Sequence, residues 1–288
     1  MLAMVLAAGL GTRLRPLTDL LPKPLVPIGD RPMLAHVVAR LRGAGCAPIV
    51  VNAHHHAGAI AAFCAREGVV VSREDDDLLG TAGGLSRAAG ALGEGDVLVH
   101  NGDVLVDVDL HAMCEAHRAH AHEREATLAV VRRARGEGNV GVDARGRVVR
   151  LRKETFSDGE IAGGEFTGVH VVSRAVRAAL PTKGCMVGDV YMPRLREDGG
   201  KYAPIYVYDA SDFVDVGTIE GYVRANVAWL GERASFVAAG ATVDPRVVLD
   251  RVVVGEGARV EGEGTLSRVV VWPNAIARAP LRDRVITP

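Results

Sequence analysis

The feature that most constrains the fold is a regular alternation of short apolar runs with helix-like segments in the first half of the chain. Apolar runs occupy residues 1–7, 49–51, 69–71 and 97–99, and the segments between them carry apolar side chains at helical spacing. Strands that alternate with helices imply a mostly parallel sheet with helices on both faces. We therefore predict a Rossmann-like α/β fold for this part of the chain.

The pattern changes twice further along. Beyond residue 132 the apolar runs are shorter, and we expect this region to complete the same sheet and to add the wall of a pocket. From residue 235, small residues, glycines and valines recur about every six residues, which is typical of a parallel β-helix with roughly three or four coils. The sequence thus predicts an α/β domain over residues 1–232 and a short hexapeptide-repeat β-helix over residues 235–288.

Charge balance and cysteine usage narrow the class of protein. The 34 basic and 35 acidic side chains nearly cancel, so we expect neither a nucleic acid nor a membrane surface as the partner. The four cysteines form no C-x-x-C pair, which favours a reduced compartment, and no apolar run approaches the length of a membrane span. These features predict a cytoplasmic protein.

A glycine turn and a stiff basic loop are the first candidates for a binding site. Gly9 and Gly11 follow the first apolar run directly, and glycines there let a backbone approach a ligand and present N–H groups to an anion. Arg13 can then hold phosphate oxygens with its planar guanidinium group. Lys23 lies between two prolines, which fix the loop and lower the entropy lost on binding. Together they predict a phosphate site.

These residues belong to a longer stretch, LAAGLGTRLRPLTDLLPKPLVPIGDRPML, which resembles the N-terminal signature of the sugar-1-phosphate nucleotidyltransferases. Four later motifs keep the order found in that family. Residues 79–84 resemble its nucleotide-base loop, residues 101–103 its strand-end metal site, residues 166–169 its sugar-contacting strand and residues 215–218 its second metal-binding motif. Several members also end in a left-handed β-helix, so the resemblance covers nearly the whole chain.

The resemblance implies an enzyme that joins a nucleoside triphosphate to a sugar 1-phosphate. Arg13, Lys23 and Asp103 are the expected catalytic residues, and Asp103 with Asp215 are the expected ligands of Mg²⁺, a hard ion that takes oxygen ligands. The expected nucleotide-binding residues are Leu6, Ala7, Ala8, Gly9, Gly11, Thr12, Arg13, Lys23, Gly80, Thr81, Gly83 and Gly84.

The sugar side departs from the family in one place. Where the family often has Glu-Lys-Pro, this chain has Arg152, Lys153 and Glu154. We expect Lys153 to bind the sugar phosphate, and Thr167 and Gly168 to line the sugar. Glu165 either accepts a hydrogen bond from a sugar hydroxyl or is a solvated residue at a strand start. The acidic run 74–77 is expected to be a solvated turn.

The sequence leaves the substrate and the assembly open. The motifs resemble mannose-1-phosphate guanylyltransferases, and also uridylyltransferases that act on glucose 1-phosphate or N-acetylmuramate 1-phosphate. A catalytically silent protein that binds a nucleotide sugar and regulates a partner is the second kind of function. An acyltransferase built on the β-helix is disfavoured because no histidine follows His170. We expect the β-helix to form a contact surface between subunits of a homo-oligomer.

Overall fold

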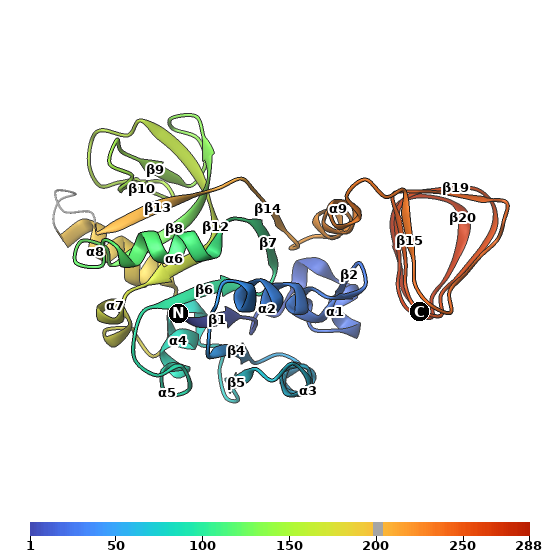
Figure 1. Ribbon diagram of the computed structural model, residues 1–288, viewed down its shortest axis with the longest axis horizontal. Helices are drawn as coiled ribbons and strands as arrows, with labels where there is room; N and C mark the ends of the chain where they lie inside the picture. The colour runs from blue at the N-terminus through green and yellow to red at the C-terminus, as the bar shows by residue number, and fades with distance from the viewer. Residues whose placement is uncertain (198–203) are drawn as a thin grey trace. The chain divides into compact units, whose positions relative to one another are not determined.

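The computed structural model describes residues 1–197 and 204–288 (Figure 1). It consists of two compact units, and each combines segments that are far apart in the sequence. Unit 1 comprises residues 1–9 and 37–213, and unit 2 comprises residues 10–36 and 214–288. No helix in the described ranges has both the length and the apolar character needed to cross a membrane.

The centre of unit 1 is a parallel sheet. Its strand β1 (Leu2–Leu6) lies between β4 (Ile49–Ala53) and β6 (Val97–Asn101) and runs parallel to both. The strand β5 (Val70–Arg73) adds to β4, again in parallel. All residues of β4 are buried, as expected for a strand covered on both faces. The predicted Rossmann-like α/β core is confirmed.

The later strands of unit 1 extend the same sheet, as the sequence predicted, but most of their pairs are antiparallel, whereas the sequence predicted a mostly parallel sheet. The long strand β12 (Ala162–Val172) pairs antiparallel with β6 and with β8 (Ala126–Arg133), and β8 pairs in parallel with β13 (Ile205–Ala210). Three short strands, β9 (Val140–Val142), β10 (Val148–Leu151) and β11 (Glu154–Thr155), continue from the other end of β12. Among the described residues this gives a ten-stranded sheet.

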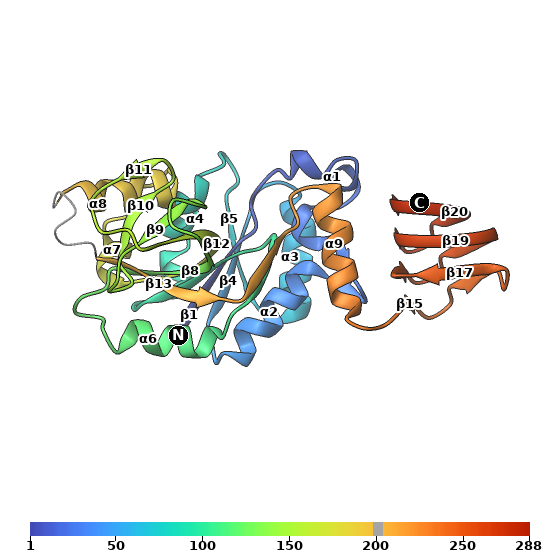
Figure 2. The same cartoon turned by 90° about the horizontal axis from the view of Figure 1, so that it is seen from above.

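Helices cover both faces of this sheet. In Figure 2, α4 (Gly80–Arg87) and α6 (Leu110–Arg118) lie on opposite sides of it; α4 contacts β1 and α6 contacts β8. The described helices of unit 1 are α3 (Ala57–Glu67), α4 (Gly80–Arg87), α5 (Ala89–Leu92), α6 (Leu110–Arg118), α7 (Arg174–Ala178) and α8 (Met192–Glu197), the last preceded by a π-helical turn (Met186–Tyr191). The strand β7 (Val104–Asp107) follows β6, and β14 (Asp212–Asp215) leads into unit 2.

Unit 2 begins with the glycine turn and ends with the C-terminal coils. Two 3₁₀ turns, Thr12–Leu14 and Lys23–Leu25, flank the short helix α1 (Leu17–Leu20). The hairpin β2 (Pro27–Ile28) and β3 (Arg31–Pro32) then leads into α2 (Met33–Gly43), which continues into unit 1.

The helix α9 (Ile219–Leu230) joins that hairpin to the coils by hydrogen bonds. The Tyr222 hydroxyl donates to the Pro27 carbonyl oxygen at 2.6 Å, and Trp272 Nε1 donates to the Tyr222 hydroxyl at 2.9 Å. The Gly29 N–H donates to Asn226 Oδ1 at 2.9 Å. The hairpin is therefore fixed by contacts with residues near the other end of the chain.

The C-terminal strands stack in parallel as a curled sheet, an arrangement consistent with the predicted β-helix (Figure 1). Phe236 aligns with Val253, and Val253 aligns with Val270, so each coil covers the apolar residues of the next. The strands are β15 (Ser235–Val237), β16 (Thr242–Val243), β17 (Val247–Asp250), β18 (Val252–Val254), β19 (Arg259–Val271) and β20 (Ile276–Ile286).

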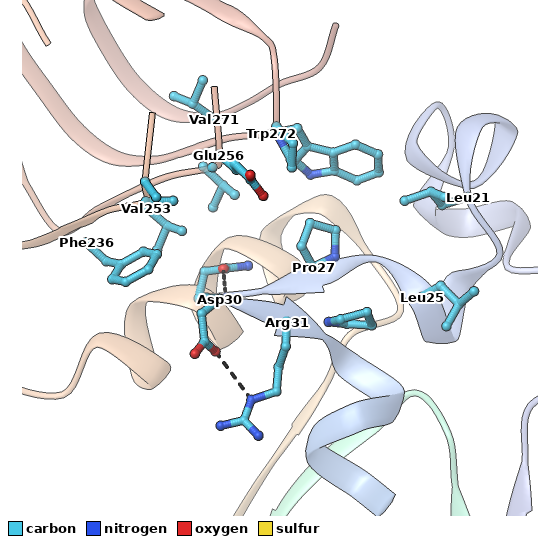
Figure 3. Close-up of a pocket in the computed structure, with 18 residues that line it drawn as sticks. Leu21, Leu25, Pro27, Asp30, Arg31, Phe236, Val253, Glu256, Val271 and Trp272 are labelled. Atoms are coloured by element: carbon cyan, nitrogen blue, oxygen red, sulfur yellow. Dashed lines mark hydrogen bonds and ion pairs between the residues drawn. The ribbon is translucent and has the colours of Figure 1, made fainter. Parts of the chain in front are cut away.

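A cavity of about 470 Å³ lies in unit 2 between the hairpin and the coils. Figure 3 shows its largely apolar lining, with Phe236 and Trp272 on the side of the coils and Leu21 and Leu25 on the side of the N-terminal segment. Leu21 and Leu25 stand two residues before and after Lys23. The cavity therefore borders the loop that carries the predicted phosphate-binding lysine.

Candidate functional site

The glycine turn and Lys23 are packed together in unit 2. Gly11 has a left-handed backbone with a φ of +65°, and a Cβ there would lie 2.9 Å from Thr18 Cγ2 and 3.0 Å from Lys23 Cβ. The Thr18 hydroxyl donates a hydrogen bond to the Gly11 carbonyl oxygen at 3.0 Å. Glycine is the residue that tolerates both the conformation and the close approach. The turn therefore holds the stem of Lys23 in one place.

Asp215 brings the C-terminal part of unit 2 to this turn. Its Oδ2 atom lies 3.9 Å from Arg13 Nη2, and its Oδ1 atom lies 3.9 Å from Lys23 Nζ. A Cβ at Gly217 would come within 2.9 Å of Arg13 Nη2 and of Asp215 Oδ1, so glycine leaves the space that these groups occupy. We call Arg13, Lys23 and Asp215 the charged cluster; it unites three of the predicted site residues.

The charged cluster is open to a ligand. This access comes from the Arg13 side chain, which is 69% exposed, and the Asp215 side chain, which is 46% exposed, whereas the Lys23 side chain is only 8% exposed. The two separations of 3.9 Å are longer than hydrogen bonds. The exposed pair of Arg13 with Asp215 contributes little to stability, because water screens it. Two cations beside a carboxylate can instead bind a polyphosphate together with its metal ion.

In unit 1 the end of β1 is held by a buried polar bridge that connects it to the segment before α4. The Ala7 N–H donates to Asn52 Oδ1 at 2.6 Å, and Asn52 Nδ2 donates to Glu74 Oε1 at 2.6 Å. Glu74 Oε2 accepts from the Leu79 N–H at 2.9 Å, and Glu74 is only 3% exposed. The expectation of a solvated turn is wrong for Glu74, because its carboxylate is buried and accepts two hydrogen bonds. We call this chain of contacts the Glu74 bridge.

Gly84 fits against the same bridge. A Cβ at residue 84 would lie 2.7 Å from Asn52 Nδ2 and 2.8 Å from Glu74 Oε1, so a larger residue would collide with both. The motif that contains Gly84 is not a loop but the start of α4. Its glycines therefore permit a helix to pack closely on the bridge.

The other residues of this motif pack on the segment before the π-helical turn. A Cβ at Gly80 would lie 2.5 Å from the Gly184 carbonyl oxygen, and one at Gly83 would lie 2.6 Å from the Thr182 carbonyl oxygen. Thr81 Oγ1 accepts a hydrogen bond from the N–H of residue 186 at 2.8 Å. Packing alone thus accounts for Gly80 and Gly83, and their predicted contact with the nucleotide stays a prediction.

The end of β1 itself differs from these tight positions. Ala7 and Ala8 are buried at 4% and 5% exposure, whereas Gly9 is exposed. A Cβ at Gly9 would meet nothing within 4 Å, so no protein contact requires glycine there. This open space beside the end of a parallel strand is where α/β sheets bind ligands.

Asp103 stands beside the end of β1. The Gly102 N–H donates to the Leu6 carbonyl oxygen at 2.8 Å, which fixes the turn that carries the half-buried Asp103. Gly168 has a φ of +83°, and a Cβ there would lie 2.4 Å from Asn101 Nδ2. The predicted metal motif and the predicted sugar strand are thus adjacent in unit 1.

A neutral histidine supports the strand that leads to Asp103. Burial lowers the pKa of His100 to about 4, and its Nδ1 atom lies 2.7 Å from the Asn101 carbonyl oxygen. A neutral ring that donates from Nδ1 fits this contact. The strand therefore reaches the predicted metal site without a nearby positive charge from His100.

On the predicted sugar side, Asn139 organises the start of β12. Its Nδ2 donates to Glu165 Oε1 at 2.9 Å, and its Oδ1 accepts from the Phe166 N–H at 2.9 Å. Glu165 is therefore hydrogen-bonded within the protein and oriented by Asn139. The Thr167 hydroxyl is buried and donates to the Ala129 carbonyl oxygen at 3.0 Å, so its side chain serves the sheet.

Lys153 lies at the tip of the β10–β11 hairpin. It is exposed, and within the described residues its side chain has no hydrogen bond or ion pair.

The described ranges contain no group of three His, Cys, Asp or Glu side chains that could hold a metal ion without other ligands. The predicted ligands Asp103 and Asp215 supply only carboxylate oxygens, a donor set that suits a hard divalent ion whose other ligands are water and phosphate.

Comparisons with known proteins agree with this chemistry. Residues 2–154 match the family model described as nucleotidyl transferase. The chain is 33% identical over 281 residues to a mannose-1-phosphate guanylyltransferase of Mycobacterium tuberculosis, covering 91% of this chain and 77% of that protein. It is 35% identical over 195 residues to an N-acetylmuramate alpha-1-phosphate uridylyltransferase of Caulobacter vibrioides, covering 62% of this chain and 78% of that protein.

A third relative and a solved structure are also similar to this chain. A UTP–glucose-1-phosphate uridylyltransferase of Synechocystis is 28% identical over 249 residues, and the chain spans 62% of its length. The fold is similar to the crystal structure of HddC from Yersinia pseudotuberculosis complexed with GMP-PN, with a TM-score of 0.63 and 21% identity over 79% of this chain and 98% of that one. At that identity the likeness supports the fold.

Proposed function

This chain belongs to the nucleotidyl transferase family, and we propose that it transfers a guanylyl group from GTP to mannose 1-phosphate. It is a sugar-1-phosphate nucleotidyltransferase, and the mycobacterial relative that matches 91% of the chain supports this pair of substrates. The observation that carries the proposal is the charged cluster, where Arg13 and Lys23 each lie 3.9 Å from Asp215.

The reaction joins two anions, so the site has to offset their repulsion. A phosphate oxygen of mannose 1-phosphate attacks the α-phosphorus of GTP, and the bond from that phosphorus to the bridging oxygen of pyrophosphate breaks. Positioning and electrostatics account for most of the catalysis in phosphoryl transfer. Arg13 and Lys23 bind the triphosphate and stabilise the charge that develops on the leaving pyrophosphate.

We further propose that the required divalent ion is Mg²⁺ and that Asp103 and Asp215 hold it. Both are carboxylates, which magnesium prefers, and it commonly uses one or two of them together with substrate phosphates. When bound, the ion would neutralise phosphate charge and orient the α-phosphate. The exposed backbone at Gly9 and the first turn of α4 are proposed to receive the ribose and the base.

The proposal also covers setting and assembly. The four cysteines, which form no C-x-x-C pair, support a cytoplasmic enzyme, and the formal net charge of −1 supports the lack of a nucleic acid or membrane partner. We propose that the β-helix forms a contact surface between copies of the chain. Light scattering of the purified protein at micromolar concentration tests this, and a monomer there would contradict it.

The substrate proposal is tested by a matrix of reactions. Four nucleoside triphosphates are each combined with mannose 1-phosphate, glucose 1-phosphate and N-acetylmuramate 1-phosphate, with Mg²⁺ present, and pyrophosphate release is measured. GTP with mannose 1-phosphate is expected to give the highest kcat/KM. A preference for UTP would replace the guanylyl proposal with uridylyl transfer, which the Caulobacter relative at 35% identity favours.

The same matrix addresses a catalytically silent regulator. Such a protein would bind a nucleotide sugar, which isothermal titration calorimetry detects, without releasing pyrophosphate from any pair. That combination of results would contradict an active enzyme. The retention of Arg13, Lys23, Asp103 and Asp215 supports turnover instead.

A further inference from the structure

Arg152 occupies an unusual backbone position next to Lys153. The register of β10 with β11 aligns Leu151 with Glu154, so residues 152 and 153 form a two-residue hairpin loop. Arg152 has a φ of +58°. Such loops usually place glycine or asparagine at positive φ, and a bulky residue there is strained. Arg251 and Arg268 of the C-terminal coils have similar φ values of +58° and +56°, so the surroundings of the Arg152 side chain, rather than its φ, distinguish it.

The guanidinium group of Arg152 lies across the segment that follows the packing site of α4. Its Nη2 atom lies 3.5 Å from Cys185 Sγ, and a Cβ at Gly188 would lie 3.5 Å from Nη1. A thiol is a weak acceptor, and no carboxylate pairs with Arg152 among the described residues. The contacts with Cys185 and Gly188 therefore orient the Arg152 guanidinium group, but no anionic side chain pairs with it among the described residues.

Arg150, two residues earlier in the same hairpin, differs from Arg152 because its side chain is bound entirely within the protein. Its side chain is 12% exposed, and its Nε and Nη2 atoms donate to the Glu160 carboxylate at 3.0 Å. It also donates to the carbonyl oxygens of residues 137, 138 and 140. Arg150 is thus fully used within the protein, whereas Arg152 keeps most of its five N–H donors for another group.

The backbone of Arg152 is attached to the residue that organises the predicted sugar side. The Arg152 N–H donates to the Asn139 carbonyl oxygen at 2.7 Å, and the Asn139 side chain holds Glu165 at 2.9 Å. Asn139 therefore ties the hairpin tip, with Lys153, to the start of β12. The tip carries two adjacent basic residues, and Asn139 connects it to the residue whose carboxylate it orients, Glu165.

We propose that Arg152 binds the phosphate of the sugar 1-phosphate together with Lys153. The guanidinium group exchanges its weak contact with Cys185 for phosphate oxygens, which it binds in a bidentate manner, while Lys153 acts as a compact charge. This inference rests on the proposed function, because it assigns a ligand to the sugar side of that site. It makes the hairpin tip a two-cation clamp that selects the dianionic phosphate.

The test uses the full-length enzyme with saturating GTP and varied mannose 1-phosphate. Arg152→Gln is expected to raise the KM for mannose 1-phosphate about tenfold, as loss of a charge-assisted hydrogen bond predicts, and to leave the KM for GTP within about twofold. Arg152→Lys is expected to recover part of the loss. Arg145→Gln makes the same charge change in the neighbouring β9–β10 turn and should leave both constants unchanged. An unchanged KM for mannose 1-phosphate in Arg152→Gln would overturn the proposal.

A second experiment tests whether Arg152 binds the phosphate or another anionic group of the sugar. It also distinguishes failure of this proposal from failure of the proposed function. Titration calorimetry compares mannose 1-phosphate, N-acetylmuramate 1-phosphate and mannose with the wild type and Arg152→Gln, without any need for turnover. If Arg152→Gln binds both sugar phosphates more weakly than wild type by the same factor, and binds mannose equally well, the phosphate assignment is supported. Weakening confined to the acidic sugar would overturn it in favour of the carboxylate. If wild type binds these phosphates but turns none over, the proposed function fails while the Arg152 result still stands.

Discussion

The charged cluster of unit 2 and the Glu74 bridge of unit 1 each contain a carboxylate, but its surroundings differ. In the cluster, Arg13 and Lys23 each lie 3.9 Å from an Asp215 side chain that is 46% exposed. In the bridge, Asn52 and Glu74 are buried and their hydrogen bonds are 2.6 to 2.9 Å long. The bridge fixes the backbone at Ala7 and Leu79, whereas the cluster has charged groups that can contact a ligand. Substitutions in the cluster should therefore affect rate, and substitutions in the bridge should affect stability.

The largest effect is expected at the cluster. Asp215→Asn removes one proposed metal ligand and one charge without changing size, so kcat should fall about a thousandfold while circular dichroism and thermal unfolding stay close to wild type. Asp212→Asn, three residues earlier at an exposed position of β14, is the matched control and should keep normal turnover. A near-normal rate in Asp215→Asn, measured by pyrophosphate release, would refute its assigned role.

The next largest effect is expected where α4 meets the bridge. Gly84→Ala would place a Cβ 2.7 Å from Asn52 Nδ2, and overpacking of this kind costs about 3 kcal/mol of unfolding free energy, measured in urea. Gly90→Ala has nothing within 4 Å and should be neutral or stabilising by up to about 1 kcal/mol, since alanine is the better helix former. Equal stability of the two variants would contradict tight packing at residue 84.

A smaller loss is expected when the bridge keeps its shape but changes its chemistry. Glu74→Gln turns one acceptor oxygen into an NH₂ group, which would face either the Asn52 amide or the Leu79 N–H. Leaving such buried donors without an acceptor costs about 2 kcal/mol. Asp76→Asn, the same charge change at an exposed neighbour, should stay within about 0.5 kcal/mol. Chemical denaturation of both variants measures the difference, and similar values would count against the bridge.

The most gradual effect, and the smallest per unit of pH, is a pH dependence that originates in the core of unit 1. Burial lowers the pKa of His100 to about 4, below its ordinary 6.5, so the unfolded chain takes up the proton first as the pH falls. Unfolding free energy should therefore decrease between pH 6.5 and 4, by about 1 kcal/mol per pH unit. His100→Asn should reduce that slope, whereas His122→Gln at an exposed site should not. An unchanged slope in His100→Asn would show that other groups cause the acid sensitivity.

The sequence predicted the architecture well because the signals are local. The alternation of strands and helices indicated the parallel core, and the six-residue rhythm indicated the stacked C-terminal coils. The roles of Asp103 and Lys153 stay predictions. That Arg13, Lys23 and Asp215 meet could be inferred only through the family resemblance, because no local pattern links residues about 190 positions apart.

The Glu74 bridge was missed for a physical reason. Asn52 and Glu74 are 22 residues apart and meet only because β4 and β5 are neighbours whose carboxyl ends coincide. An acidic run is usually solvated, and the structure agrees for its exposed members at residues 75–77. The available signal was positional: Glu74 and Asn52 both stand at the ends of adjacent parallel strands, where polar side chains can reach each other.

The hydrogen bonds from Trp272 to Tyr222 and from Tyr222 to Pro27 have a spectroscopic consequence. The chain has two tryptophans, Trp229 and Trp272, and both belong to unit 2. Trp272 is 4% exposed, and its bonded partner reaches the carbonyl oxygen of a residue four positions after Lys23. Intrinsic tryptophan emission is therefore an unlabelled optical reporter of unit 2 alone. Stopped-flow fluorescence can follow rearrangement around the phosphate-binding loop, because the sheet of unit 1 contributes no tryptophan emission.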